Sequence, residues 1–330
     1  MFYYTKALCT PIPYPANRDS IHHLFGPLTA RGGAGQDQAP SCADAFARIH
    51  VSLCLPGNYG VRAPATGEFL GALDADIALS AGDWRETGYQ MAIINCNALL
   101  GYGAEDHHIV KAARQPIRDG PGVMAALYDK QVQSVKLDEA LEDAVSLFAK
   151  TGEIVYRRLG DANVYPYLHA SLVALHFLSA FPAAMEELLF PYPWEQLDRM
   201  LDSIEVLSLP KFLAIGGGMA VDGTDMKIDG DEFPRDDWSR PLPEDYALRG
   251  LLWTEPWYFP DDWFKAAAAG ADEDERHLER PSTTEARKLR ILWLARKLVK
   301  TRRTPLTYGE SRTQGGLGFA TQGLGQPGPS

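Results

Sequence analysis

The sequence predicts an all-α protein, because helical periodicity is its dominant pattern and strand-like alternation is scarce. The clearest helix is expected over 137–159, where apolar residues form one stripe and acidic residues occupy the other face. The stripe consists of Leu137, Leu141, Ala144, Val145 and Phe148. Two more helices are expected, over 167–181 and from a start after Pro193. Short breaks join these three helices, which predicts antiparallel helical hairpins.

Further helices are expected towards the N-terminus. Residues 1–8 form an apolar, aromatic helix, and Asn17 offers an N-cap for a second helix that continues through Phe25. A nearly all-apolar helix is expected over 84–100, with glycines directly after it. The glycine-rich stretches 31–40 and 57–67 are expected to be breaks between helices.

Composition places the chain among ordinary globular proteins. It has 330 residues, of which 45% are apolar and 23% charged, so it can bury a large core. The net charge of -11 argues against strong non-specific nucleic-acid binding. Four cysteines without a CxxC pair, and no secretory signal, favour a reducing compartment, nucleus or cytoplasm. Prolines and histidines interrupt the longest apolar run, 164–190, so we expect no membrane span.

Segment 242–250 predicts a short capped helix. Pro243 suits a first helical turn, and the carboxylates of Glu244 and Asp245 favour the positive end of the helix dipole. Arg249 follows these acids by about one turn, at a spacing that allows an ion pair, and Gly250 can end the helix.

Charge changes sign along the last third of the chain. An acidic loop is expected over 213–240, and from 222 to 279 there are 17 acidic against 6 basic residues. From 281 to 312 the balance reverses to nine basic against two acidic residues, within a helix expected over 284–303. This basic helix is the candidate nucleic-acid site, with Arg287, Lys288, Arg290, Arg296, Lys297, Lys300, Arg302 and Arg303. The alternative is that the helix pairs internally with the acidic residues just before it, including 272–275.

Catalytic and metal-binding patterns are weak. The triple glycine at 216–218 lacks the Lys-Ser/Thr of a phosphate loop, and the acidic loop lacks calcium-site spacing. His169 and His176 are expected to be core or groove histidines, so no cofactor or metal is expected. A distant alternative is a hydrolase that uses Asp261 and Asp262 among the aromatic residues of 250–264.

Several segments resemble, in their order, one helical family. The entry segment 2–25 resembles the "YY-x-RSL … PFPSAREN-x-x-x-LF" start of the DNA/RNA-binding domain of the "ever shorter telomeres" telomerase accessory proteins and nonsense-mediated mRNA decay adaptors. Segment 242–250 is similar to its "LPED-x-x-LRG" segment, and 163–175 to its central helix entry. Segments 250–264 and 290–294 resemble the filamentous-fungal version. The residues that match as structural markers are Tyr4, Leu8, Arg18, Leu242, Pro243, Glu244, Asp245, Leu248, Arg249, Gly250, Trp253, Trp263 and Trp293.

The resemblance implies a solenoid of antiparallel helical hairpins, a tetratricopeptide-like superhelix with long loops, over 1–300. It implies no catalysis. Lys6 stands where the family has arginine, and the chain begins at the entry segment. We therefore expect a form without the family's N-terminal 14-3-3-like domain and carry over no phosphopeptide binding. The tail, 304–330, is expected to be disordered.

The function expected is a non-enzymatic scaffold in telomerase recruitment, telomere maintenance or nonsense-mediated mRNA decay. Its expected partners are proteins of telomerase or mRNA-decay complexes, with single-stranded telomeric DNA or RNA as a further candidate. The alternative is a purely protein-binding helical module without affinity for nucleic acid. Neither a membrane nor a small-molecule substrate is expected.

Overall fold

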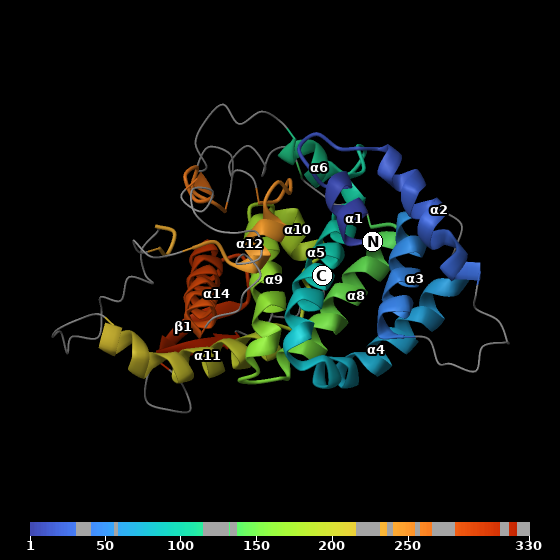
Figure 1. The fold of residues 1–330 in the computed structure, drawn as a ribbon. Helices are drawn as coiled ribbons and strands as arrows, with labels where there is room; N and C mark the ends of the chain where they lie inside the picture. Colours follow the sequence, from blue (N-terminus) through green and yellow to red (C-terminus); the bar gives the residue numbers. More distant parts are fainter. Residues whose placement is uncertain are drawn as a thin grey trace, which may run out of the picture.

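A computed structural model describes residues 1–30, 41–55, 59–114, 132, 137–215, 232–235, 240–254, 258–265, 281–310 and 317–321. Most of these residues are helical, so the predicted helical fold is confirmed (Figure 1). The elements are α1 (Phe2–Leu8), α2 (Ala16–Ala30), α3 (Cys42–Cys54), α4 (Tyr59–Ser80), η1 (Ala81–Asp83), α5 (Trp84–Leu99), η2 (Gly101–Gly103), α6 (His108–Ala113), α8 (Glu139–Tyr156), η3 (Ala162–Val164), α9 (Tyr165–Leu178), α10 (Pro182–Glu187), α11 (Trp194–Ile215), α12 (Pro243–Leu248), α14 (Pro281–Thr301), β1 (Leu306–Glu310) and β2 (Leu317–Thr321).

Helices α5 and α9 form the centre of the core. Every residue of α9 except His176 is buried, because α5, α12 and α14 all pack against this helix. Helix α5 contacts α1, α8, α9 and α12, which explains why its sequence is apolar on nearly all sides. Figure 1 shows α5, α8 and α9 lying between the α2–α4 group and the α11–α14 group. Within the described part of the chain, no helix combines the length and apolarity needed to span a bilayer.

Helices α3 and α4 pack against each other and then on the core through α8. The Ser41 side chain caps α3 by accepting a hydrogen bond from the Asp44 amide. Helix α4 begins at Tyr59, so the predicted break over 57–67 is wrong from residue 59 onwards. The reason is a stripe at four-residue spacing that is buried against α3 and outweighs the glycines and Pro64. The stripe is Ala65, Phe69, Leu73 and Ile77.

Helix α8 agrees with the predicted stripe over 137–159. The Asp138 carboxylate accepts a hydrogen bond from the Leu141 amide at 2.8 Å and caps the helix. All the predicted stripe residues from Leu141 onwards are buried. The sequence therefore determined this helix locally, and tertiary contacts added its partners α4, α5 and α11.

The C-terminal residues include a β-hairpin that the sequence reading did not predict. Strands β1 and β2 pair antiparallel, with Tyr308 opposite Phe319. Strand β2 packs on α11 and β1 on α14, and the Phe319 amide donates to the Asp202 carboxylate at 2.7 Å. The expectation of a disordered tail over 304–330 is therefore wrong for 304–310 and 317–321, while 311–316 and 322–330 lie outside the described residues.

Candidate functional site

The segment 242–250 lies at the centre of a buried charge cluster. Glu244 on α12 is fully buried, and Arg287 on α14 is 1% exposed. The Arg287 guanidinium donates two hydrogen bonds to the Glu244 carboxylate, from Nε at 2.6 Å and from a terminal nitrogen at 2.9 Å. This bidentate geometry is the strongest form of arginine–carboxylate pairing. It fixes α14 against α12 at a point where neither side chain reaches water.

Helix α9 supplies a third member of the charge cluster. His169 is fully buried, and its Nδ1 lies 2.9 Å from a Glu244 oxygen. Its Nε2 is hydrogen-bonded to the hydroxyl of Tyr258. His169 therefore links α9 to both α12 and the segment that follows it, as a satisfied core histidine, which confirms the prediction made for it.

Asp245 anchors a second half of the cluster. One of its carboxylate oxygens accepts from the Leu242 amide at 2.9 Å, from Trp263 Nε1 at 3.2 Å and from Arg290 at 3.4 Å. The Arg290 guanidinium also lies 3.8 Å from the Phe233 ring centre and donates to the Tyr258 hydroxyl at 3.2 Å. Two carboxylates and two guanidinium groups thus balance in charge inside the protein, as buried ions require.

Electrostatics keep Glu244 ionised. Burial alone would raise the pKa of Glu244, but the charge of Arg287 and the hydrogen bonds from His169 and Arg287 hold it well below its usual range. The charged pair is therefore the form present at neutral pH.

The predicted roles of the 242–250 residues are confirmed in part. Pro243 opens the helix, the Asp245 side chain accepts from the Leu242 amide, and Gly250 follows the helix at a φ of 84°. The expected ion pair between Arg249 and the two acids is wrong. Arg249 lies instead over the Phe264 ring at 4.6 Å, because the carboxylates turn inward towards α14.

The basic helix does not present the predicted basic surface. Arg287, Arg290 and Arg296 are 1%, 3% and 8% exposed, so the structure encloses these three side chains and does not present them to a phosphate at the surface. The physical reason is that apolar residues surround α14, so the helix is drawn into the core and its arginines must pair there. The acids that pair with them are Glu244, Asp245 and Glu205. The expected partners at 272–275 lie outside the described residues.

The remaining candidates lie towards the end of the helix. Lys288 is 8% exposed and pairs with Glu285 at 3.1 Å, and Lys297 lies over the Trp293 ring at 5.4 Å. Arg303 donates to the carbonyl oxygens of 179 and 180 at the end of α9. Lys300 and Arg302 are the exposed members of the predicted set.

The other residues that resemble family markers also pack or form hydrogen bonds inside the protein. Leu8 and Leu248 are buried, and Trp253 Nε1 donates to Asn97 on α5 at 3.0 Å. Arg18 donates to the carbonyl oxygen of Cys54 at 3.1 Å and so ties α2 to the end of α3. Tyr4 packs edge-on against Phe25, and Trp293 against Phe233.

The hydrolase alternative needs a pair of carboxylates that face one cleft. Asp261 and Asp262 are exposed, and Asp262 pairs with Arg235 at 2.8 Å. Glu244 is enclosed in the interior, so these acids do not share a site. Among the described residues, no three His, Cys, Asp or Glu side chains gather to hold a metal ion. The glycines at 216–218 lie outside the described residues.

Sequence reasoning missed several polar links between helices. Arg62 pairs with Asp143 at 2.7 Å across α4 and α8, and Arg296 pairs with Glu205 at 3.0 Å. His50 is fully buried between the Tyr102 hydroxyl and the Asn95 amide oxygen. These partners are 45 to 91 positions apart in sequence, so no local pattern could have joined them.

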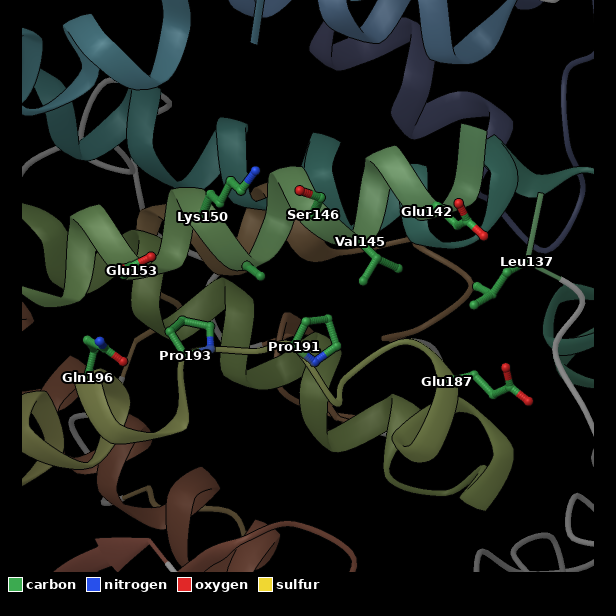
Figure 2. A pocket seen from close by; sticks show the side chains of 11 residues that line it. Leu137, Glu142, Val145, Ser146, Lys150, Glu153, Glu187, Pro191, Pro193 and Gln196 are labelled. Atoms are coloured by element: carbon green, nitrogen blue, oxygen red, sulfur yellow. The ribbon is translucent and has the colours of Figure 1, made fainter. Parts of the chain in front are cut away.

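A surface groove of about 630 Å³ runs between α8 and the chain from α10 to the start of α11. Its apolar lining is Leu137, Val145, Ala149, Pro191 and Pro193. Figure 2 shows Glu142 and Glu187 near Leu137 at one end, and Lys150, Glu153 and Gln196 towards the other. The volume and mixed lining suit a small segment of a partner molecule.

No family model and no curated protein sequence matches this chain.

Proposed function

We propose that this protein is a non-enzymatic helical adaptor that binds other proteins. The observation that carries the proposal is the orientation of α14, whose arginines face Glu244, Asp245 and Glu205 inside the protein. With those charges neutralised internally and a net charge of -11, protein binding is favoured over nucleic-acid binding.

The resemblance supports a role in telomerase recruitment and telomere maintenance or in nonsense-mediated mRNA decay, in the nucleus or cytoplasm. Four of the segments that carry it, 163–175, 242–250, 250–264 and 290–294, are far apart in sequence but meet around one buried cluster through His169, Glu244, Asp245, Trp263 and Arg290. A set of segments that jointly holds one helical arrangement together fits a scaffold. The hairpin solenoid over 1–300 belongs to the same proposal.

A second candidate function is weak nucleic-acid binding at the end of α14. It is favoured by Lys300 and Arg302, which are both exposed and lie two positions apart in the chain. Two phosphate contacts to a single strand would give a salt slope of only about -1.4 in log K against log salt. This footprint is much smaller than the eight-residue site that the sequence predicted.

Fluorescence anisotropy with labelled telomeric single strands and RNA, over a salt series, tests the proposal. We expect dissociation constants of about 10⁻⁴ M or weaker at physiological salt, the range of non-specific contacts. The double variant Lys300→Glu/Arg302→Glu should then change little. Micromolar or tighter binding that weakens steeply with salt would overturn the preference for protein partners.

A second experiment measures direct binding of this protein to purified components of telomerase and of the mRNA-decay machinery. Saturable binding to a component of either complex, at a fixed stoichiometry, is the expected result and assigns the pathway. Turnover of a substrate by the purified chain would refute the non-enzymatic role.

A further inference from the structure

We propose that the groove between α8 and the α10–α11 connection binds a basic, partly apolar peptide segment of a partner protein. This inference rests on the proposed adaptor function, because it names the chemistry of a partner and the surface that receives it. Neither the buried charge cluster nor α14 takes part.

The floor and walls of the groove are apolar. Val145 and Ala149 on α8 are 6% and 8% exposed, so the floor is packed against the core and does not need to close on a ligand. Pro191 and Pro193 form the opposite wall, and Leu137 stands at one end (Figure 2). Apolar side chains of a peptide would be shielded from water on these surfaces.

The wall of the groove formed by Pro191 and Pro193 is held in place by hydrogen bonds without a ligand. Tyr192, between the two prolines, is buried and its hydroxyl is hydrogen-bonded to that of Tyr156 on α8. Trp194 Nε1 donates to the Leu189 carbonyl at 3.1 Å and fixes the turn over 189–194, directly before α11. A side chain at Gly152 would stand 3.4 Å from the Pro193 ring and 3.1 Å from Tyr156, so the glycine permits this close approach. A preformed wall lowers the ordering cost of binding.

The charge of the residues that line the groove favours a basic peptide. Glu142 on α8 and Glu187 on α10 are both exposed at the Leu137 end, and the described residues that line this end include no lysine or arginine (Figure 2). At the other end Lys150 faces solvent, while Glu153 pairs with Arg157 of its own helix. A lysine or arginine of the ligand would therefore lie beside Glu142 and Glu187. The net charge of -11 adds long-range attraction for such a segment.

Phe190 extends the apolar surface beyond the groove. Its side chain is 61% exposed and directly precedes Pro191. A peptide in the groove would cover this ring and remove it from water. An exposed aromatic residue beside an apolar groove is typical of a binding surface.

The test titrates the full chain with three labelled peptides of equal length. One combines leucine and proline with arginine, one replaces arginine by glutamate, and one replaces the apolar residues by serine and keeps arginine. We expect the first to bind best, because it alone matches both the apolar wall and the acidic end. Equal binding of all three, or no binding of the first, would overturn the proposal.

Charge reversal locates the site. In Glu142→Lys/Glu187→Lys the arginine peptide should bind about tenfold more weakly, while the glutamate peptide gains affinity. The matched control is Glu105→Lys/Glu195→Lys, which changes the net charge equally at exposed acids outside the groove lining. An equal loss in control and groove variants would show that only bulk charge matters and would refute the groove.

The two proposals fail in different ways. If the arginine peptide does not bind but the chain still binds a purified telomerase or decay component, the groove assignment is wrong and the adaptor role stands. If the peptide binds at the groove but nucleic acid also binds tightly with a steep salt slope, the groove assignment stands and the adaptor proposal fails.

Discussion

Removing the charge of Glu244 is the most direct test of the buried cluster. Glu244→Gln keeps the size of the side chain and one carbonyl oxygen, but it leaves the guanidinium of Arg287 without a carboxylate. Arg287 is 1% exposed, so its guanidinium stays largely desolvated after the carboxylate charge is removed. Arg287→Met is the complementary change, and it leaves the buried Glu244 with His169 as its partner.

The magnitude follows from burial. Breaking one side of a fully buried ion pair costs about 3–5 kcal/mol, because the remaining charge stays desolvated. The double variant Glu244→Leu/Arg287→Met removes both charges and should cost about 2–3 kcal/mol less than the sum of the single variants. His169 then loses the acceptor for Nδ1, which keeps the double variant below wild-type stability.

Urea and thermal unfolding, followed by far-UV circular dichroism at neutral pH, measure these changes. An unfolding entropy of about 2.1 cal/mol/K per residue over 330 residues converts 3–5 kcal/mol into a Tm about 4–7 °C lower. The control is Glu153→Gln, which breaks a pair with Arg157 on the surface of α8. That change should cost about 0.5 kcal/mol or less.

The pH dependence gives an independent check with a definite sign. The pKa of Glu244 is depressed in the folded protein, so its contribution to stability is complete above the unfolded value of 4.5 and is lost as pH falls below it. The free energy of unfolding of Glu244→Gln should therefore approach that of the wild type as the pH falls below 4.5. A single variant within about 0.5 kcal/mol of wild type, or strict additivity in the double variant, would refute the buried pair.

Three further predictions concern the scaffold. Gly103→Ala should destabilise by about 2 kcal/mol more than Gly250→Ala in urea unfolding. Both glycines have positive φ, but only at Gly103 does a Cβ meet a backbone oxygen, that of Leu8 at 2.2 Å; equal losses would refute the clash. Burial lowers the pKa of His50 to about 3, so His50 alone should lower the free energy of unfolding by about 1.4 kcal/mol per pH unit as pH drops below 6.5. Burial also lowers the pKa of His107 and His176, so His50→Gln should remove one part of the wild-type slope when urea midpoints are measured against pH. Phe319→Ala should cost about 3 kcal/mol in thermal unfolding, because its ring is 4% exposed between β1 and α11; an unchanged Tm would show an undocked hairpin.

Local patterns predicted the helices whose signals lie within one segment. The stripe predicted α8, the apolar run ended by glycines predicted α5, and Pro243 with Gly250 predicted α12. In each case the periodicity and the end signals agree, so packing did not have to override propensity. Helix α4 was missed, because its glycines and Pro64 signal a break and only contact with α3 outweighs them.

The β-hairpin shows where prediction from local sequence patterns fails, because its strands have a low apolar content. Strands β1 and β2 are glycine-containing segments of five residues each, too short and too polar to stand out. They become ordered because α11 and α14 offer a surface and Asp198 and Asp202 accept hydrogen bonds from β2. Such a strand pair has no stability of its own, so its prediction requires the surface that supports it.

The sequence by itself determined the helical class, most helix positions, the capped segment 242–250 and the basic composition of α14. It could not determine which way the arginines of α14 point. Helical periodicity places Arg287 and Arg290 on one face, but only the packed structure puts Glu244, Asp245 and His169 opposite that face. Helix α14, whose sequence resembles a phosphate-binding surface, therefore holds the interior together through ion pairs. A buried charge requires a partner of opposite charge, and here distant parts of the chain supply the partners.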